Sequence, residues 1–473
     1  MKILFCSGEV YPFSKTGGLA DVASILPREI KHLGHEIYVI TPLYQQSNSF
    51  LPNMKHLGSI DIKMGSLTKK ADYYQYFYQN ITYIFIRNDE YYDRPLLYTY
   101  EDDDKRFTFF NYAILESLPL LNYYPDIIHT NDWQTGLISY LLDTKYRQYN
   151  DQYKRIKTLL SIHNLEKQGS FDLSTESLFE VKNYTYMHND RVNFLKAAIM
   201  RSSAINTVSE TYKSEILTRF YGFALDGPLK SKQYQLFGIL NGFDNRLYDP
   251  SLNKDLIKNY DLTSFNAGKK ANKKALTEQL GFDDDLPLFA FIGRFSRQKG
   301  IDILVHSLDN YLKNNQLNFI AIGKGTANFE NYFKELEKKF PSNVYFSNSY
   351  DQVLTQRFYA ASDFYLLPSL FEPCGLNQMI AMRYGTLPIV RETGGLKDTV
   401  ISYFKDQENG YGFSFENYDV EEFKQTMDQV LEIYKDKKQM DKIIRRAMSI
   451  EFSTTKMAEE YVNLYKLIID DEI

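Results

Sequence analysis

Two cations follow one short apolar run in the second half of the chain. The run Leu288–Gly293 is followed by Arg294 and then by Lys299, on a loop that Gly300 closes. A guanidinium fork and a point ammonium together suit a diphosphate and the negative charge that develops as it departs. The same residues would also fit an ordinary solvated basic loop. The pattern therefore indicates a candidate anion site without excluding a plain surface loop.

A carboxylate follows a later apolar run, which ends at Leu367. Glu372 lies between Phe371 and Pro373, just before Cys374, Gly375 and Leu376. Such a carboxylate could orient sugar hydroxyls or stabilise cationic character at carbon. It could equally be an acidic residue that answers the dipole of a following helix. No partner base stands near Cys374, so we interpret this thiol as a packing or ligand-contact group.

Polar side chains also end two apolar runs in the first half. His163 and Asn164 follow the run Thr158–Ile162, and both side chains can hydrogen-bond sugar hydroxyls. Asp132 and Trp133, the only tryptophan, follow the run Asp126–His129. An indole beside an acid is a common way to hold a sugar ring, although a lone His or Trp is often structural.

One short motif occurs twice, each time after an apolar run and before a helical pattern. Its copies are Thr16-Gly17-Gly18-Leu19, preceded by Lys15, and Thr393-Gly394-Gly395-Leu396. Glycines allow close backbone approach, and the free N–H groups of a first helical turn attract anions. Either copy alone could be mere turn chemistry. Their repetition in equivalent places favours two ligand-contacting loops.

The elements that must position these residues are alternating strands and helices. Apolar runs rich in Val, Ile and Phe recur along both halves, each followed by a stretch of helical period, which is typical of parallel sheets. The pattern lapses near residues 241–250, in a stretch dense in Asn, Asp, Gly and Pro. We therefore predict an α/β protein with two facing doubly wound domains, residues 1–243 and 244–454, and an interdomain cleft. The final helix, 455–473, is expected to pack back on the first domain because its apolar residues share one face.

Composition excludes several classes of protein. The 473 residues carry 55 Lys and Arg against 60 Asp and Glu, a balance that argues against a polyanion-coating protein and a nucleic-acid partner. Two cysteines cannot form a disulfide framework and fit a reducing cytoplasm. No run approaches the roughly 20 apolar residues that span a bilayer, so no membrane partner is expected. No metal-ligand spacing is present, so neither a metal nor another cofactor is expected.

Taken together, these motifs resemble the bacterial glycogen synthases, members of the ADP-glucose starch and glycogen synthase family. The resemblance rests on Lys15–Val22, the His163-Asn164 pair, Arg294 with Lys299, Glu372–Leu376 and Thr393–Leu396, and it runs in order to about residue 470. It implies a GT-B fold, ADP-glucose as donor and the non-reducing end of an α-1,4-glucan such as glycogen as acceptor. It also implies retention of configuration without a metal.

The resemblance further implies a role for each matching residue. Catalytic roles fall on a carboxylate, two cations that stabilise the departing ADP and a histidine near the reacting carbon: Glu372, Arg294, Lys299 and His163. Donor contacts fall on Lys15, Gly17, Gly18, Asp21, Asn164, Asn241 at the interdomain hinge, Tyr350 stacked on adenine, Cys374, Gly375, Leu376, Thr393, Gly394 and Gly395. Acceptor contacts fall on Asp132 and Trp133.

Departures from the family and alternative functions bear on this prediction. Gln134 stands where the family usually has His, which affects acceptor contacts more than donor chemistry. The sequence offers no dedicated partner for a carboxylate nucleophile, so front-face attack is the favoured retaining mechanism. The alternatives are a UDP-glucose-dependent GT-B transferase, a catalytically silent glucan-binding protein and a glucan phosphorylase with pyridoxal phosphate.

Overall fold

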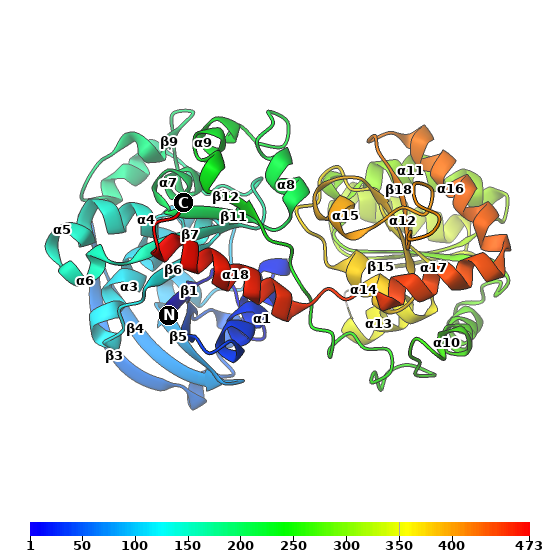
Figure 1. The fold of residues 1–473 in the computed structure, drawn as a ribbon, viewed down its shortest axis with the longest axis horizontal. Helices are drawn as coiled ribbons and strands as arrows, with labels where there is room; N and C mark the ends of the chain where they lie inside the picture. Colours follow the sequence, from blue (N-terminus) through cyan, green and yellow to red (C-terminus); the bar gives the residue numbers. More distant parts are fainter. Residues whose placement is uncertain (350) are drawn as a thin grey trace. The chain divides into compact units, whose positions relative to one another are not determined.

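The computed structural model describes residues 1–349 and 351–473, which form two compact units (Figure 1). Unit 1 comprises Met1–Gly242 with Ser453–Ile473, and unit 2 comprises Phe243–Phe452. The boundary after Gly242 lies one residue before the predicted one. Because the chain returns to unit 1 at Ser453, the last helix belongs to the first domain, as its apolar face predicts.

Unit 1 is built on a nine-stranded sheet. Its strand order is β12-β11-β7-β6-β1-β2-β5-β4-β3, and the first seven of these strands run parallel to one another. The strands are β1 (Lys2–Cys6), β2 (Glu36–Pro42), β3 (Lys55–Met64), β4 (Leu67–Tyr78), β5 (Ile81–Arg87), β6 (Ile127–Asn131), β7 (Lys157–Ile162), β11 (Ala204–Thr207) and β12 (Leu236–Gly238). A small second sheet comprises β8 (Ser170–Phe171), β9 (Met187–His188) and β10 (Arg191–Asn193).

The hairpin β3–β4 was not predicted from the sequence. It pairs antiparallel with β5 and extends the parallel sheet at one edge. Its residues mix charged and tyrosine side chains, and most of them are only partly buried. Such a strand pair lacks the continuous apolar run that marks buried parallel strands, so its signal is weak.

Helices cover both faces of the unit 1 sheet. One buried cluster lies under α1 and the final helix, and a second lies under α3, α4 and α7. Helix α18 packs beside α1 (Figure 1). The hydroxyls of its Tyr461 and Tyr465 bond Asn206 and His129 at 2.9 and 2.7 Å. The helices are α1 (Gly18–His32), α2 (Asp89–Tyr92), α3 (Asp103–Leu121), α4 (Ile138–Leu141), α5 (Arg147–Tyr149), α6 (Asp151–Lys154), α7 (Phe194–Arg201), α8 (Glu210–Glu215), α9 (Asp226–Ser231) and α18 (Thr454–Ile469).

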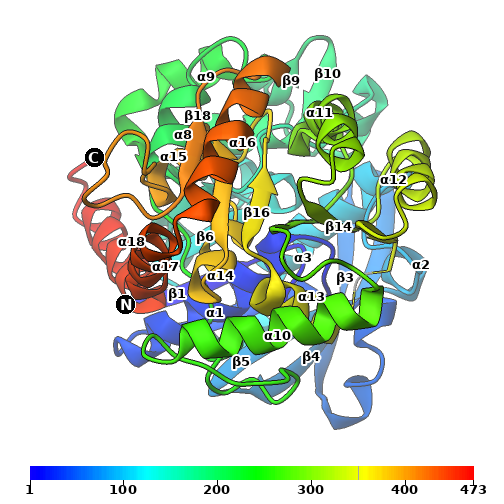
Figure 2. The same cartoon turned by 90° about the vertical axis from the view of Figure 1, so that its right-hand side faces the viewer.

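Unit 2 is built on a six-stranded parallel sheet in the order β15-β14-β13-β16-β17-β18. Figure 2 shows its long helix α10, in green, which packs on α13. The strands are β13 (Leu288–Ile292), β14 (Asn318–Ile322), β15 (Val344–Ser347), β16 (Phe364–Leu367), β17 (Leu387–Arg391) and β18 (Phe413–Phe415). The helices are α10 (Phe265–Leu280), α11 (Ile301–Lys313), α12 (Ala327–Lys339), α13 (Gln352–Ala361), α14 (Asn377–Arg383), α15 (Gly394–Thr399), α16 (Val420–Lys435) and α17 (Lys437–Ser449).

Both sheets are doubly wound, and each reverses its strand order once. The first strand of each unit lies between its second and fourth parallel strands, which places switch points between β1 and β6 and between β13 and β16. Sheets of this kind bind ligands outside the carboxyl ends of their strands at the switch point. Among the described residues, no helix is long and apolar enough to cross a membrane.

Candidate functional site

The switch point of unit 2 brings together the three motifs predicted in the second half of the chain. The loop after β13 carries Arg294 and Lys299, the loop after β16 carries Glu372, and the turn after β17 carries Gly394. Leu370 N–H donates to the carbonyl of Gln298 at 2.9 Å, which joins the first two loops. Parallel strands therefore deliver two cations and a carboxylate to one edge of the sheet.

Lys299 and Glu372 form an ion pair. The Nζ of Lys299 lies 2.5 Å from Oε2 of Glu372, whose side chain is 7% exposed. Ser369 Oγ donates to the same carboxylate oxygen at 3.3 Å. Arg294 lies exposed on the same loop, and within the described part of the chain its guanidinium has no hydrogen bond or ion pair. One predicted cation is thus held by the predicted carboxylate, whereas the other is available to a ligand.

The second glycine pair packs directly on the Glu372 loop. The N–H of Gly395 donates to the carbonyls of Glu372 and Pro373 at 3.0 and 3.2 Å. A Cβ on Gly394, whose φ is +45°, would lie 2.0 Å from the Glu372 carbonyl oxygen. These contacts correct the expectation that Gly395 donates its N–H to the donor, because that N–H already holds the Glu372 loop.

A methyl group at Gly395 is therefore expected to displace the catalytic loop. Its Cβ would lie 2.2 Å from the carbonyl oxygen of Cys374, so the backbone must move. We expect Gly395→Ala to lower glucosyl transfer by at least about tenfold, because misplacing a reacting group by about 1 Å can cost more than that. Steady-state assays would measure this loss. Gly227→Ala is the control, because nothing lies within 4 Å of the added Cβ; equal activity of the two variants would contradict the prediction.

Arg391 is a buried cation that sequence analysis did not single out. Its Nε donates to the carbonyl of Ser369 at 2.7 Å and a terminal nitrogen to that of Leu370 at 2.5 Å. Through these two bonds Arg391 fixes the short segment that precedes Glu372. The signal in the sequence is slight: Arg391 is the last residue of a strand, and only its place two residues before the Thr393–Leu396 motif could have pointed to it.

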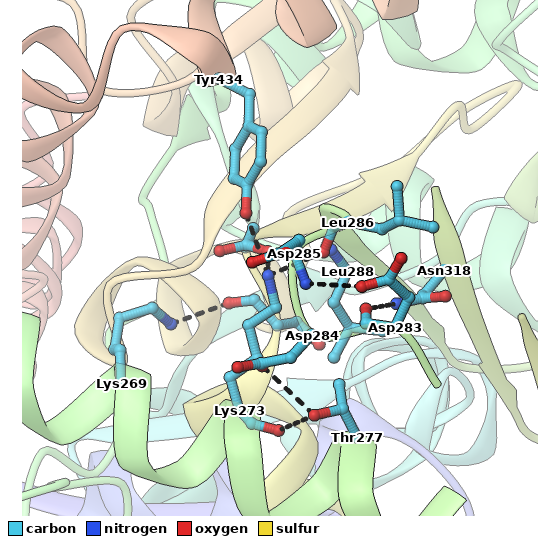
Figure 3. Close-up of polar contacts among 12 residues, drawn as sticks. Lys269, Lys273, Thr277, Asp283, Asp284, Asp285, Leu286, Leu288, Asn318 and Tyr434 are labelled. Atoms are coloured by element: carbon cyan, nitrogen blue, oxygen red, sulfur yellow. Dashed lines mark hydrogen bonds and ion pairs between the residues drawn. The ribbon is translucent and has the colours of Figure 1, made fainter. Parts of the chain in front are cut away.

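Two buried lysines of α10 fix the opposite ends of the strands that carry these loops (Figure 3). Lys273 donates to Asp363 and to the hydroxyl of Tyr434 at 2.8 and 3.0 Å, and Asp363 accepts the N–H of Leu288 at 2.8 Å. Lys269 donates to the carbonyl of Ser362 at 2.8 Å. Asp363 immediately precedes β16 and Leu288 begins β13, so this network sets the two strands in register.

In unit 1, the first glycine pair opens α1 and lies beside a paired lysine. The Nζ of Lys15 lies 2.6 and 2.8 Å from the two carboxylate oxygens of Asp21 and 5.5 Å from the ring centre of Tyr11. Gly17 precedes the first helical residue, Gly18, and both Lys15 and Gly18 are exposed. The loop therefore presents a cation and a helix N-terminus to solvent, as predicted for a phosphate contact.

His163 and Asp132 meet at the ends of β7 and β6. Asp132 Oδ1 accepts the backbone N–H of His163 at 2.7 Å and that of Asn164 at 3.4 Å, and His163 Nε2 lies 2.9 Å from Oδ1 of Asn131. Burial lowers the pKa of His163 to about 4, so its imidazole is neutral near pH 7. Burial, with the charge of Glu9 adding to it, raises the pKa of Asp132 to about 7. Asp132 also has a φ of +53°, an uncommon value that the surrounding bonds hold in place.

The raised pKa of Asp132 predicts a pH-dependent effect of Asp132→Asn on stability. The carboxyl binds its proton more tightly in the folded than in the unfolded protein, so its contribution to stability is present at low pH and is lost as pH rises through about 7. Asparagine has no such loss and can still accept the same backbone bonds. We expect the free energy of unfolding of Asp132→Asn, relative to that of the wild type, to be about 2–3 kcal/mol higher at pH 8 than at pH 5. Urea unfolding of both proteins at the two pH values measures this difference.

Asp190→Asn is the control for this measurement. Asp190 is exposed and has a similar φ of +57°, so Asp190→Asn makes the same chemical change at a site where the carboxyl is not buried. A gain of equal size at both pH values in the Asp132 variant would contradict the raised pKa.

Three further predicted site residues are not placed where a ligand contact can be described. Trp133 is 8% exposed and packs against Phe107 and Phe171 at centroid distances of 4.8 and 5.7 Å, so it is a core residue. This corrects its predicted role as an acceptor platform. Asn241 is buried in unit 1, and its Oδ1 has no hydrogen bond to the residues that the structure describes. The predicted adenine contact, Tyr350, lies outside the described residues.

Comparison with known proteins decides the family. Residues 2–231 match the family described as starch synthase catalytic domain, and residues 272–447 match glycosyl transferases group 1. The glycogen synthase of Acholeplasma laidlawii is 48% identical over the whole of both chains. The chain belongs to the glycogen synthase family. A second member, from Clostridium botulinum, is 40% identical over 98% of this chain and 99% of its own.

Two solved structures are similar to this chain along nearly its whole length. The catalytic domain of starch synthase IV from Arabidopsis thaliana, bound to ADP and acarbose, is 30% identical and superposes with a TM-score of 0.90 over 99% of both chains. A sucrose-phosphate synthase from Thermosynechococcus elongatus, 18% identical with a TM-score of 0.62, shares the fold alone. The protein is therefore a glycosyltransferase with the two-domain GT-B fold.

Proposed function

We propose that this protein is a glycogen synthase that transfers glucose from ADP-glucose to the non-reducing end of an α-1,4-glucan with retention of configuration. The observation that carries the proposal is the arrangement at the switch point of unit 2, where Arg294, Lys299 and Glu372 lie on adjoining loops. The ADP and acarbose bound to starch synthase IV support the ligand classes. We place the protein in the cytoplasm, where Cys6 and Cys374, which form no disulfide, remain reduced thiols.

The cations of unit 2 serve the leaving group in this proposal. Arg294 and Lys299 bind the diphosphate and stabilise the charge that builds up as the bond from the glucose anomeric carbon to the phosphate oxygen breaks. Glu372 orients glucose hydroxyls and holds Lys299 in place. Cys374, Gly375, Leu376, Thr393 and Gly394 line the donor around them. Tyr350 stacks on adenine.

Residues of unit 1 contact the sugar and the phosphates. Lys15 and Gly18 meet the diphosphate, and Asp21 keeps Lys15 in position. His163 and Asn164 hydrogen-bond the transferred glucose, and Asn241 contacts the donor. Asp132 faces the acceptor. A neutral imidazole suits the role of His163: its Nε2–H donates to Oδ1 of Asn131 at 2.9 Å, so Nδ1 can accept a hydrogen bond from a glucose hydroxyl without adding charge beside the reacting carbon.

The transfer follows a front-face path. The acceptor hydroxyl oxygen bonds to the anomeric carbon on the side from which ADP departs, and its proton passes to a phosphate oxygen of ADP. Configuration is retained because bond breaking and bond making share one face, and no covalent enzyme intermediate forms. The proposed reaction uses no metal, since the two cations supply the positive charge.

A direct assay tests this function. Glucose incorporation into glycogen is measured from ADP-glucose and UDP-glucose side by side, with and without EDTA. We expect transfer from ADP-glucose that EDTA leaves unchanged. Preference for UDP-glucose would assign the other donor, loss with EDTA would contradict metal independence, and no transfer from either donor would favour a binding protein. Absorbance of bound pyridoxal phosphate would instead point to a phosphorylase.

A further inference from the structure

One buried carboxylate of unit 1 lies behind the Lys15 loop and has no place in the function described so far. Glu9 follows β1 at the switch point and is 3% exposed, whereas Thr16 in front of it is exposed. Burying a carboxylate is costly unless hydrogen-bond donors compensate for the lost water. The donors that surround Glu9 therefore indicate what it holds.

All the donors that bond the Glu9 carboxylate come from the exposed loop. Its Oε2 accepts the backbone N–H of Thr16 at 2.5 Å and the Thr16 hydroxyl at 2.8 Å. Gly17 lies beside the other carboxylate oxygen, since a Cβ built on it would lie 3.5 Å from Oε1. The loop is thus attached to one buried group through two donors of Thr16.

Glu9 itself is firmly fixed. Its carbonyl accepts the hydroxyl of Ser7 at 2.7 Å, and the N–H of Ser7 bonds the carbonyl of Ile40 on β2 at 3.1 Å. On its other side, the N–H of Ser14 donates to the carbonyl of Val10 at 2.9 Å. Glu9 therefore links the exposed loop to the central strands and fixes the position of the loop relative to them.

The bonds to Glu9 also decide which backbone groups remain for a ligand. The N–H group of Thr16 points inward to the carboxylate, so the first turn of α1, beginning at Gly18, offers the N–H groups that a ligand can reach. Lys15, which immediately precedes the attached segment, is held outward in its pair with Asp21. This sorting of inward and outward groups fits an anion that approaches from solvent.

We infer that Glu9 is a positioning residue for the donor: it fixes the loop 15–18 so that Lys15 and the first turn of α1 meet the diphosphate. The inference rests on the proposed function, because the diphosphate is that of the proposed donor. A loop ordered before binding loses less conformational entropy when the ligand arrives, so removing the attachment weakens donor binding. The acceptor gains nothing from it.

Two substitutions test this role. Glu9→Gln removes the charge of the side chain while keeping its size, so both bonds from Thr16 lose the strength that an ionised acceptor gives them. We expect the Kd for ADP, measured by calorimetry, and the KM for ADP-glucose to rise by about tenfold, with the KM for glycogen changed less than about twofold. Thr16→Val removes only the hydroxyl and is expected to raise the Kd by about threefold. The rise in the double variant should be smaller than the product of the two single effects, because both changes act on one contact.

Controls separate this inference from the proposed function. Glu36→Gln alters a half-buried glutamate at the start of β2 and should leave the Kd unchanged. An unchanged Kd in Glu9→Gln, or a rise in the glycogen KM alone, would overturn the inference while leaving the proposed function intact. A wild type that neither binds ADP nor transfers glucose would overturn both. If Glu9→Gln fails to fold, the Thr16→Val Kd decides, and a value equal to that of the wild type overturns the inference.

Discussion

Replacing Arg294 by alanine is expected to lower kcat by about 100- to 1,000-fold, because a cation that meets the leaving group acts mainly in the transition state. The guanidinium is exposed and has no partner in the described part of the chain, so its removal leaves no buried charge behind. Stability should therefore stay within about 0.5 kcal/mol of the wild type. Single-turnover assays and urea unfolding measure the two effects separately.

Arg297 offers a matched control on the same loop. Its side chain is 76% exposed and lies 3.8 Å from Asp302, at the start of α11. Arg297→Ala removes the same charge at nearly the same place in the sequence, yet it should leave kcat within about twofold of the wild type, because only general electrostatic attraction is lost. Equal losses in Arg294→Ala and Arg297→Ala would show that the loop acts through net charge alone.

Replacing Lys299 by alanine is expected to reduce both activity and stability. The loss in kcat should again be about 100- to 1,000-fold, since a leaving-group cation is removed. In addition, Glu372 loses its ion-pair partner while its carboxylate stays buried, which should cost about 1–3 kcal/mol of unfolding free energy. This second effect distinguishes Lys299 from Arg294, although both are basic residues of one loop.

A double variant separates the two consequences. Lys299→Met with Glu372→Gln removes both charges of the pair and keeps side chains of similar size, so most of the lost stability should return. Activity should not return, because the cation and the carboxylate are both absent. Recovery of turnover in the double variant would mean that Lys299 acts only by neutralising Glu372.

The chemistry that each strand end carries can be predicted from the amino-acid sequence. Arg294 and Lys299, Glu372, and the two Gly-Gly motifs all follow apolar runs, and such runs become parallel strands because burial on both faces requires continuous apolar side chains. Strand type and the polarity of the following loop are local properties, so they can be predicted from neighbouring residues.

Which of these groups contact one another depends on how the strands are ordered in the folded chain. Lys299 and Glu372 are 73 residues apart, and their contact depends on β13 and β16 lying side by side. Strand order is set by how helices pack on both faces of a sheet, which local sequence does not encode. The same reason explains why Glu9 could not be predicted from the sequence, since its two donors from Thr16 reach it only when the loop folds over it.

Burial decided the remaining differences. An indole can hold a sugar or fill a core, and the rings around Trp133 selected the core. An N–H at a glycine turn can meet a ligand or a neighbouring loop, and Gly395 meets the carbonyl of Glu372. In both cases the residue type is compatible with two environments of similar free energy. Long-range packing determines which of the two forms, because the native fold leaves the fewest buried polar groups without a hydrogen bond.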